Sequence, residues 1–198
     1  TVPTLAFNGD PGAGNNQRWG DTLDVRGAGT NTQILIGSRA SNVVALLTTT
    51  NGTHFSARMI SVPAAPNGAF GLGMAFGEGN TFWGKANSHN LRQVAFTFAT
   101  GVGTILRSHG SPDFPGTIAP IGVSPGLNLL GGINVGATGN NFRLFDLTPT
   151  NGTPVFIAST NFASDNDNTG SGTGAVDFGR DRVYALGAAQ VMRGGDLG

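Results

Sequence analysis

Few side chains in this sequence could do chemistry, and they are widely spaced. The 198 residues include 11 acidic and 11 basic side chains, three histidines and no cysteine. The lack of cysteine excludes disulfides, thiolate catalysis and cysteine-based metal sites. His54, His89 and His109 do not have the spacing of metal ligands, and we expect them in turns or at the surface. The thin spread of these residues argues against an enzyme, although a dispersed Ser-His-Asp set stays open.

The only acidic residues that lie two positions apart are Asp165 and Asp167. They begin a segment, Asp165–Gly170, in which side chains with oxygen alternate and a glycine follows, as at the start of a calcium loop. A calcium site would use Asp165, Asp167 and Thr169. Val176 stands where the closing acidic residue is needed, so a polar connection is the favoured interpretation. We expect no other cofactor.

Two Asn-Gly-Thr triplets, at Asn51 and Asn151, match the acceptor pattern for N-glycosylation. The same triplets suit tight hairpin turns, because Asn-Gly readily adopts positive φ angles. Their equivalent places in the chain favour the turn, and Pro154 weakens the second triplet as an acceptor. Both interpretations place the two asparagines at exposed hairpin tips.

Aromatic residues offer a surface on which a sugar ring could stack. We expect Phe82 to pack between sheets and Trp83 to be the more exposed ring. Arg18 lies beside Trp19 and would bind acidic groups or brace the nearby strands. The candidate ligand-binding residues are therefore Arg18, Trp19 and Trp83.

The sequence repeats with a period of 50 residues, and the strands of these repeats would position the side chains named above. Apolar runs end at turns that contain Thr50, Thr100 and Thr150, and another apolar run follows each turn. Repeats of about 40 to 50 residues with four strands are typical of β-propeller blades. A single blade cannot bury both of its faces, so the repeats must stack on one another.

The sequence thus predicts an all-β, β-propeller-type fold with three full four-stranded blades and a partial fourth. Residues 1–198 form one domain, with repeats at about 21–70, 71–119, 120–173 and 174–198. Residues 1–20 supply a strand and a loop that complete the last blade or pair with another copy; alternatively, the chain is a piece of a larger propeller. The expected strands are Leu23–Val25, Gln33–Ser38, Val43–Thr48, Phe55–Val62, Met74–Phe76, Thr81–Lys85, Val94–Phe98, Thr104–Arg107, Ile121–Val123, Leu127–Ile133, Phe142–Leu147, Val155–Thr160, Ala175–Phe178 and Arg182–Leu186.

The composition restricts the partners and the location. The formal net charge is zero, so nucleic acid is a poor partner, and no apolar run is long enough to span a bilayer. Glycine supplies 33 residues, and Lys85 is the sole lysine. Such a composition is typical of an exported protein. The sequence begins without a signal peptide or an initiator methionine, so we expect a mature product or an excised piece.

Four runs of sequence resemble an uncharacterised family of bacterial exported β-propeller-like proteins. They are Asn8–Arg39, Gly68–Lys85, Leu91–Leu106 and Gly172–Leu186. The resemblance covers nearly the whole chain and implies export, but the family has no assigned activity to carry over. Its members look longer, with further repeats upstream. The tail after Leu186 departs from the family pattern.

Together these features predict a non-enzymatic extracellular structural or interaction module. Its open sheet edges would mediate self-assembly, including fibre formation, and its partners would be a second copy, another extracellular protein or a glycan. The alternative is a propeller that binds or processes carbohydrate in a central pocket. In either case we expect the protein outside the cell or at the cell surface.

Overall fold

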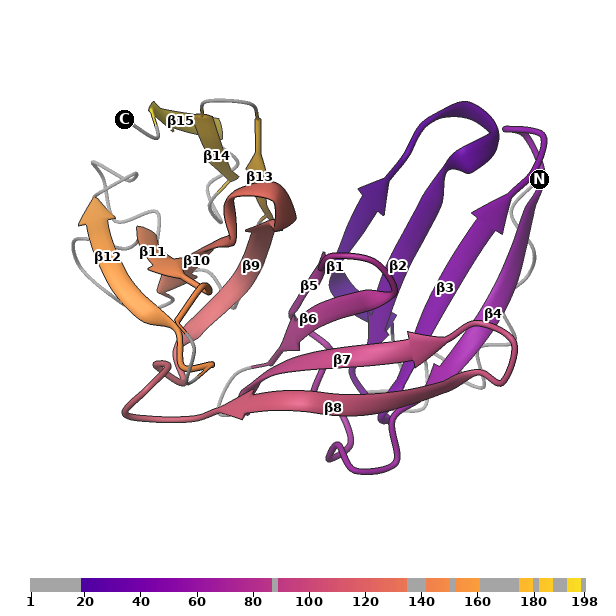
Figure 1. Ribbon diagram of the computed structural model, residues 1–198, viewed down its shortest axis with the longest axis horizontal. Helices are drawn as coiled ribbons and strands as arrows, with labels where there is room; N and C mark the ends of the chain where they lie inside the picture. The colour runs from indigo at the N-terminus through magenta and orange to yellow at the C-terminus, as the bar shows by residue number, and fades with distance from the viewer. Residues whose placement is uncertain are drawn as a thin grey trace, which may run out of the picture.

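The computed structural model of the chain is all-β (Figure 1). It describes residues 19–86, 89–134, 142–149, 152–160, 175–179, 182–186 and 192–196. In these ranges the only helical segments are two 3₁₀ turns, η1 (Gly29–Asn31) and η2 (Pro125–Leu127). A helix with the length and apolar character to cross a membrane is therefore not found among the described residues.

The first eight strands form two antiparallel units of four strands, each in chain order. The first unit is β1 (Trp19–Arg26), β2 (Gln33–Ser38), β3 (Val43–Thr49) and β4 (Phe55–Ser61). The second unit is β5 (Gly73–Phe76), β6 (Thr81–Lys85), β7 (Leu91–Thr97) and β8 (Val102–His109).

The two units share one eight-stranded sheet, whereas the sequence predicted separate four-stranded sheets. Strand β4 lies parallel to β8, with Ser61 opposite Val102. The Ser61 N–H donates to the Gly101 carbonyl at 2.9 Å. This contact arises between the last strands of adjacent units, a long-range pairing that no local pattern reveals.

The remaining strands form two further antiparallel units. The third unit is β9 (Ile118–Ser124), β10 (Leu129–Asn134), β11 (Phe142–Asp146) and β12 (Val155–Thr160). The fourth unit is β13 (Ala175–Phe178), β14 (Arg182–Leu186) and β15 (Met192–Asp196).

Two details of these units differ from the prediction. Strand β15 was not expected, because its Gly-Gly pair lacks strand-forming character; it forms by pairing with the edge of β14. Leu127 was expected in a strand but lies in η2, where Pro125 begins the turn and Asn128 closes it in a left-handed conformation.

The turn glycines of the 50-residue repeat behave as predicted. Gly52, Gly101 and Gly152 have φ angles of 77°, 68° and 75°. A residue with a Cβ is strained in this region, so glycine is favoured there. The side chain of Asn51 adds to the first turn, since its Oδ1 accepts the N–H groups of Thr53 and His54 at 3.0 and 2.8 Å.

The first strands of the four units lie against one another in chain order. β1 contacts β5, β5 contacts β9, and β9 contacts β13 near the middle of the molecule (Figure 1). Glycine permits this approach of backbones: a Cβ on Gly73 would lie 3.0 Å from the Ile121 nitrogen, and one on Gly122 would lie 2.3 Å from the Val176 carbonyl oxygen.

Strands β5 and β6 of the second unit are buried on both faces. On β6, Phe82 packs into a core shared with the first unit, whereas Trp83 packs into a core shared with the third. Successive side chains of a strand point to opposite faces, so one dipeptide contributes to both cores. A third core, around Phe142 and Val176, lies between the third and fourth units.

Candidate functional site

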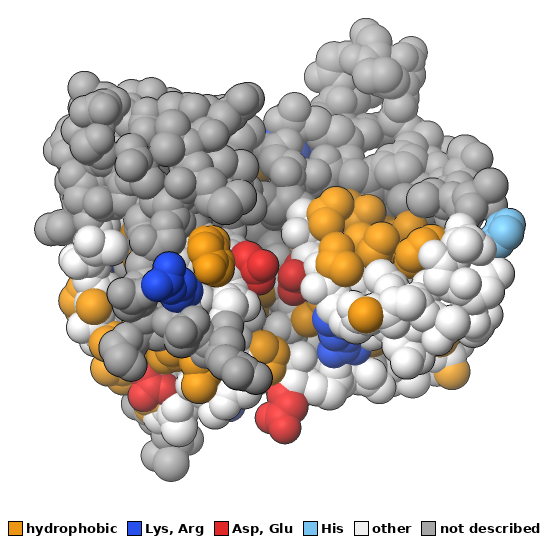
Figure 2. Space-filling model, turned by 90° about the horizontal axis from the view of Figure 1, so that it is seen from above, with side chains coloured by type: hydrophobic (Ala, Val, Ile, Leu, Met, Phe, Trp, Pro, Cys, Tyr) orange, Lys and Arg blue, Asp and Glu red, His pale blue; other side chains and the backbone are white. Residues whose placement is uncertain are grey.

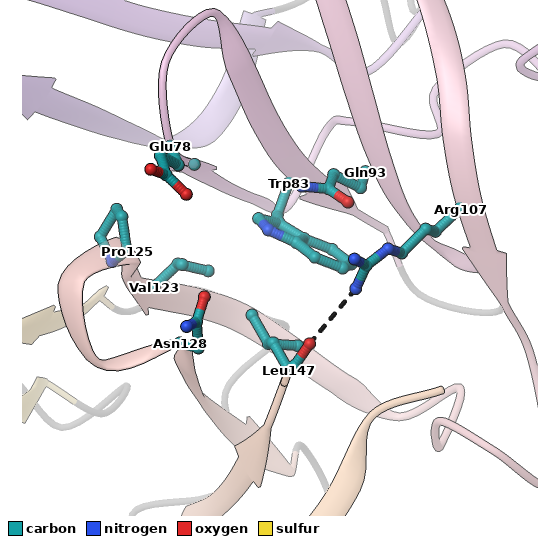
Figure 3. Close-up of a pocket in the computed structure, with 9 residues that line it drawn as sticks. Glu78, Trp83, Gln93, Arg107, Val123, Pro125, Asn128 and Leu147 are labelled. Carbon is teal, nitrogen blue, oxygen red and sulfur yellow. Dashed lines mark hydrogen bonds between the residues drawn. The ribbon is translucent and has the colours of Figure 1, made fainter. Parts of the chain in front are cut away.

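A polar pocket lies between the second and third units (Figure 3). Its volume is about 110 Å³. The nine residues that line it are Gly77, Glu78, Trp83, Gln93, Arg107, Val123, Pro125, Asn128 and Leu147. The first five come from the second unit and the other four from the third, so the pocket exists only when the two units are packed together.

Three side chains of the second unit form a row across its strands. Trp83 on β6 lies opposite Gln93 on β7, and Gln93 lies opposite Arg107 on β8. Antiparallel partners share a face, so all three point toward the third unit. The Arg107 guanidinium carbon lies 6.0 Å from the centroid of the Trp83 ring, a cation–π distance.

Arg107 also reaches the third unit. Its Nη1 donates to the Leu147 carbonyl at 3.2 Å, the dashed line in Figure 3. This bond joins β8 to the end of β11 and fixes the guanidinium at one side of the pocket.

The opposite wall is the turn that follows β9. Asn128 has φ 53° and ψ 37°, a left-handed conformation that asparagine tolerates better than most residues. Its N–H donates to the Pro125 carbonyl at 3.3 Å, and its carbonyl accepts the Leu147 N–H at 2.8 Å. These bonds hold the side-chain amide of Asn128 at the pocket.

Glu78, the sole glutamate of the chain, lies on the turn between β5 and β6. The turn is held from within, because the Thr81 hydroxyl donates to the Glu78 carbonyl at 2.7 Å. It is also held from the first unit, where Arg26 donates to the carbonyls of Gly77 and Gly79 and stacks 4.2 Å above the Phe76 ring. Strand β1 therefore helps to position Glu78.

Two further carboxylates, Asp24 and Asp177, lie on the first strands of the first and fourth units. Asp24 on β1 accepts the Phe76 N–H at 2.6 Å and the Val25 N–H at 2.8 Å. The pKa of the Asp24 carboxyl is raised, chiefly by burial and also by the charge of Asp177 on β13, although the two backbone hydrogen bonds lower it. Asp177 in turn accepts the N–H of Phe178. Because both carboxylates bond to backbone N–H groups, we assign them to joining and shaping strands.

The pocket combines opposite charges with two amides and an aromatic edge. In Figure 3 the Trp83 ring lies between Glu78 on one side and Arg107 on the other. The amides of Gln93 and Asn128 can donate and accept. The lining residues include no serine, cysteine or histidine. No cluster of three metal-ligating side chains occurs within the described ranges.

Of the candidates from the sequence, the pocket contains Trp83. The prediction that its ring is exposed was wrong, since Trp83 is only 2% exposed. The physical reason is that β6 is covered on both faces, so the residue beside a buried Phe82 is buried as well. The side chain of Trp19 and all of Arg18 lie outside the described residues, as do Asn151 and the segment with Asp165, Asp167 and Thr169.

Asn51 is exposed at the turn between β3 and β4, and its glycosylation stays a prediction. His54 is exposed in the same turn, as expected, and His89 is half-buried. His109 is buried, which corrects the prediction of a turn or surface position: it ends β8 opposite Leu91. Burial lowers the pKa of His109.

Sequence reasoning missed four polar residues of the pocket: Glu78, Gln93, Arg107 and Asn128. Gln93 carried a usable signal, because it is an uncharged polar residue between Arg92 and Val94, which are both buried. Arg107 carried a weaker signal. Strand β8 has one extra residue between the partners of Gln93 and Val94, and this bulge changes the face of the sheet on which Arg107 lies.

No family model and no curated protein matches this chain. Among solved structures, it is similar to a protein from Bacteroides uniformis that is provisionally named a 6-phosphogluconolactonase. The identity is 13% and the TM-score 0.53, over 84% of this chain and 47% of that one. It is also similar to a DUF4623 family protein from Bacteroides eggerthii, with 12% identity and a TM-score of 0.54, over 92% of this chain and 46% of that one.

A streptogramin B lyase structure is a weaker match, with 15% identity and a TM-score of 0.46, over 88% of this chain and 53% of that one. This chain thus spans about half the length of the structures it matches. At these identities the likeness concerns the fold alone. It is consistent with the resemblance to an uncharacterised family, since a DUF4623 family protein is among the matches.

Proposed function

We propose that this chain is part of a β-propeller and that the pocket between its second and third units binds the acidic end of a small hydroxylated molecule. The observation that carries the proposal is the convergence of Arg107, Gln93 and Asn128 on one pocket at the seam between two units.

The arrangement of the strands supports a propeller. Each unit is an antiparallel meander, and the first strands of successive units contact one another in order. Blades around a common axis have this arrangement, with the first strand of each nearest the axis. The fold likeness at TM-scores of 0.53 and 0.54 agrees with this interpretation.

The lining of the pocket supports the choice of ligand. A guanidinium presents paired N–H donors that match a carboxylate or phosphate, and Arg107 uses Nη1 for the Leu147 carbonyl while its group faces the pocket. The two amides and the Glu78 carboxylate suit hydroxyl groups. A volume of about 110 Å³ is small beside the several hundred cubic ångströms of most ligand pockets, so it fits one end of a molecule rather than an oligosaccharide chain.

Isothermal titration calorimetry with gluconate, galacturonate and glucose tests the proposal. We expect one or both acids to bind and neutral glucose to bind more weakly, because glucose lacks the group that pairs with Arg107. Arg107→Gln should weaken binding of the acid by about tenfold or more, since a hydrogen bond to a charged group is lost. Arg107→Lys should recover only part of the affinity, because lysine keeps the charge without the paired donors.

Arg143→Gln is the matched control, because Arg143 is half-buried on β11 and does not line the pocket. Its affinity for the acid should equal that of the wild type. Equal binding by the Arg107→Gln variant, or no binding of either acid by a folded wild type, would exclude this ligand class.

We further propose that the protein acts outside the cell or at the cell surface, where it binds a small acid, a glycan or another extracellular protein. The support is compositional: the chain has one lysine, no cysteine and 33 glycines. Localisation by fractionation of the producing bacterium tests this, and recovery in the cytoplasm alone would contradict it.

A further inference from the structure

Two opposite charges line the pocket between the second and third units. Glu78 brings a carboxylate from the turn between β5 and β6, and Arg107 brings a guanidinium from β8. Arg107 is the partner proposed above for the acidic end of a ligand. The group that meets Glu78 therefore determines what else that ligand carries.

The two charges do not neutralise each other. In Figure 3 the Trp83 ring lies between them, and the hydrogen bond of Arg107 goes to the Leu147 carbonyl. Within the described ranges, the Glu78 carboxylate has neither an ion pair nor a hydrogen bond, since the bond at this residue uses its backbone carbonyl. A ligand can therefore meet both charges at once.

Arg26 does not neutralise Glu78 either, although it lies beside the same turn. Its Nη1 donates to the carbonyls of Gly77 and Gly79, and its Nε donates to the Gln33 side chain at 2.7 Å. These bonds hold the backbone on both sides of Glu78. They fix the position from which the side chain starts and leave its carboxylate available to a ligand.

Other carboxylates near the middle of the molecule are already used. Figure 2 shows acidic side chains where the half with the first two units meets the half with the third and fourth. Asp24 and Asp177, on the first strands of their units, each accept backbone N–H groups. Glu78 is the one acidic residue among the nine that line the pocket. It is thus the carboxylate that a cationic group of the ligand would meet.

The charges of the pocket favour a ligand that carries both signs. A carboxylate accepts hydrogen bonds from hydroxyl and from ammonium groups, and those from an ammonium group are roughly twice as strong. Glu78 and Arg107 together have no net charge, so a ligand with one acid and one amine leaves neither of them unpaired. A ligand that is only an acid places a like charge in the same pocket as Glu78, which is unfavourable.

We propose that the ligand of this pocket is a zwitterion, a small hydroxylated acid that also carries an amino group. Its acid binds Arg107 and its ammonium group binds Glu78, while the amides of Gln93 and Asn128 serve the hydroxyl groups. This inference rests on the proposed function and narrows its ligand to aminated sugar acids and similar hydroxylated amino acids.

Isothermal titration calorimetry with matched acids tests the zwitterion. The acids are gluconate, glucosaminate, in which an amine replaces the hydroxyl next to the acid, and the isomer with the amine at the far end of the chain. Glu78 is exposed, so water competes for its charge. We therefore expect at least one aminated acid to bind about fivefold more tightly than gluconate, the effect of one exposed ion pair. Glucosamine has the amine without the acid and should bind more weakly than that aminated acid.

Glu78→Gln should reduce the preference for the aminated acid to less than about twofold, because glutamine keeps the shape of the side chain without its charge. Asp113→Asn is the matched control. Asp113 is exposed between β8 and β9 and does not line the pocket, so its variant should keep the full preference.

The outcomes separate this inference from the proposed function. If gluconate binds and neither aminated acid binds more tightly, the zwitterion is wrong and the acid site stands. An undiminished preference in a folded Glu78→Gln variant would also overturn the inference. If a folded wild type binds none of the acids, the proposed function fails and this inference fails with it.

Discussion

Phe82→Ala will lower the free energy of unfolding by about 3–5 kcal/mol, the usual cost of truncating a buried phenylalanine. Phe82 is 0% exposed and lies in the core between the first and second units. Its ring meets Phe70 edge-on at 5.5 Å between centroids and lies 6.1 Å from Phe96. Alanine removes these contacts and leaves a cavity, because the strands on both sides are fixed by their sheet hydrogen bonds. Denaturant unfolding followed by tryptophan fluorescence measures the loss.

Phe98→Ala is the control for this measurement. Phe98 is 44% exposed in the turn after β7, so its truncation should change the free energy of unfolding by less than about 1 kcal/mol. A similar loss for both variants would mean that the core between the first two units does not contribute as the packing implies.

The strands were largely predictable because their signal is local. Alternating or continuous apolar runs end at Gly- and Asn-containing turns, and the three glycines at 52, 101 and 152 mark equivalent hairpins. The 50-residue spacing of those turns also indicated units of about four strands. Such features depend on residues close in sequence, which is the information that a single sequence holds most directly.

The pairing between units was not predictable in the same way. The contact of Ser61 with Gly101 joins β4 to β8 across 40 residues, and neither residue carries a sign of it. Strand β15 also formed without strand propensity, because the edge of β14 supplied its hydrogen bonds. In both cases tertiary contact outweighs local preference.

The candidate site was missed for a related reason. The pocket is assembled from two units, and its residues carry no motif spacing. The burial of Trp83 follows from the presence of a third unit beyond β6, which local alternation does not reveal. The one signal that sequence analysis could have used is Gln93, a polar residue whose neighbours on β7 are buried.

Lys85 gives the second large effect, which is a dependence of stability on pH. This sole lysine is 0% exposed, and its Nζ donates to the carbonyls of Ala86, His89 and Gly116 at 3.2, 2.8 and 3.0 Å. The bond to Gly116 joins the end of β6 to the segment that leads into β9. Burial, and secondly the positive charge of Arg92, lower the pKa of Lys85 from 10.5 to about 8.

The sign follows from the two protonation states. Between pH 8 and 10.5 the unfolded chain keeps the proton on Lys85, whereas the folded chain has released it. Stability rises with pH wherever the unfolded state binds more protons. The contribution of Lys85 to the free energy of unfolding therefore increases by about 3 kcal/mol across this window, and it is constant below it, where both states are charged.

Lys85→Met isolates this contribution, because methionine has a similar length and does not titrate. Every other group titrates in both proteins, so the difference between their free energies of unfolding reports Lys85 alone. We expect that difference to grow by about 3 kcal/mol in favour of the wild type between pH 8 and 10.5. Since the test compares slopes, it holds whether or not methionine stabilises the protein at neutral pH. Parallel pH profiles for the two proteins would show that Lys85 titrates as an ordinary lysine, and that its three carbonyl partners, rather than its burial, dominate its charge state.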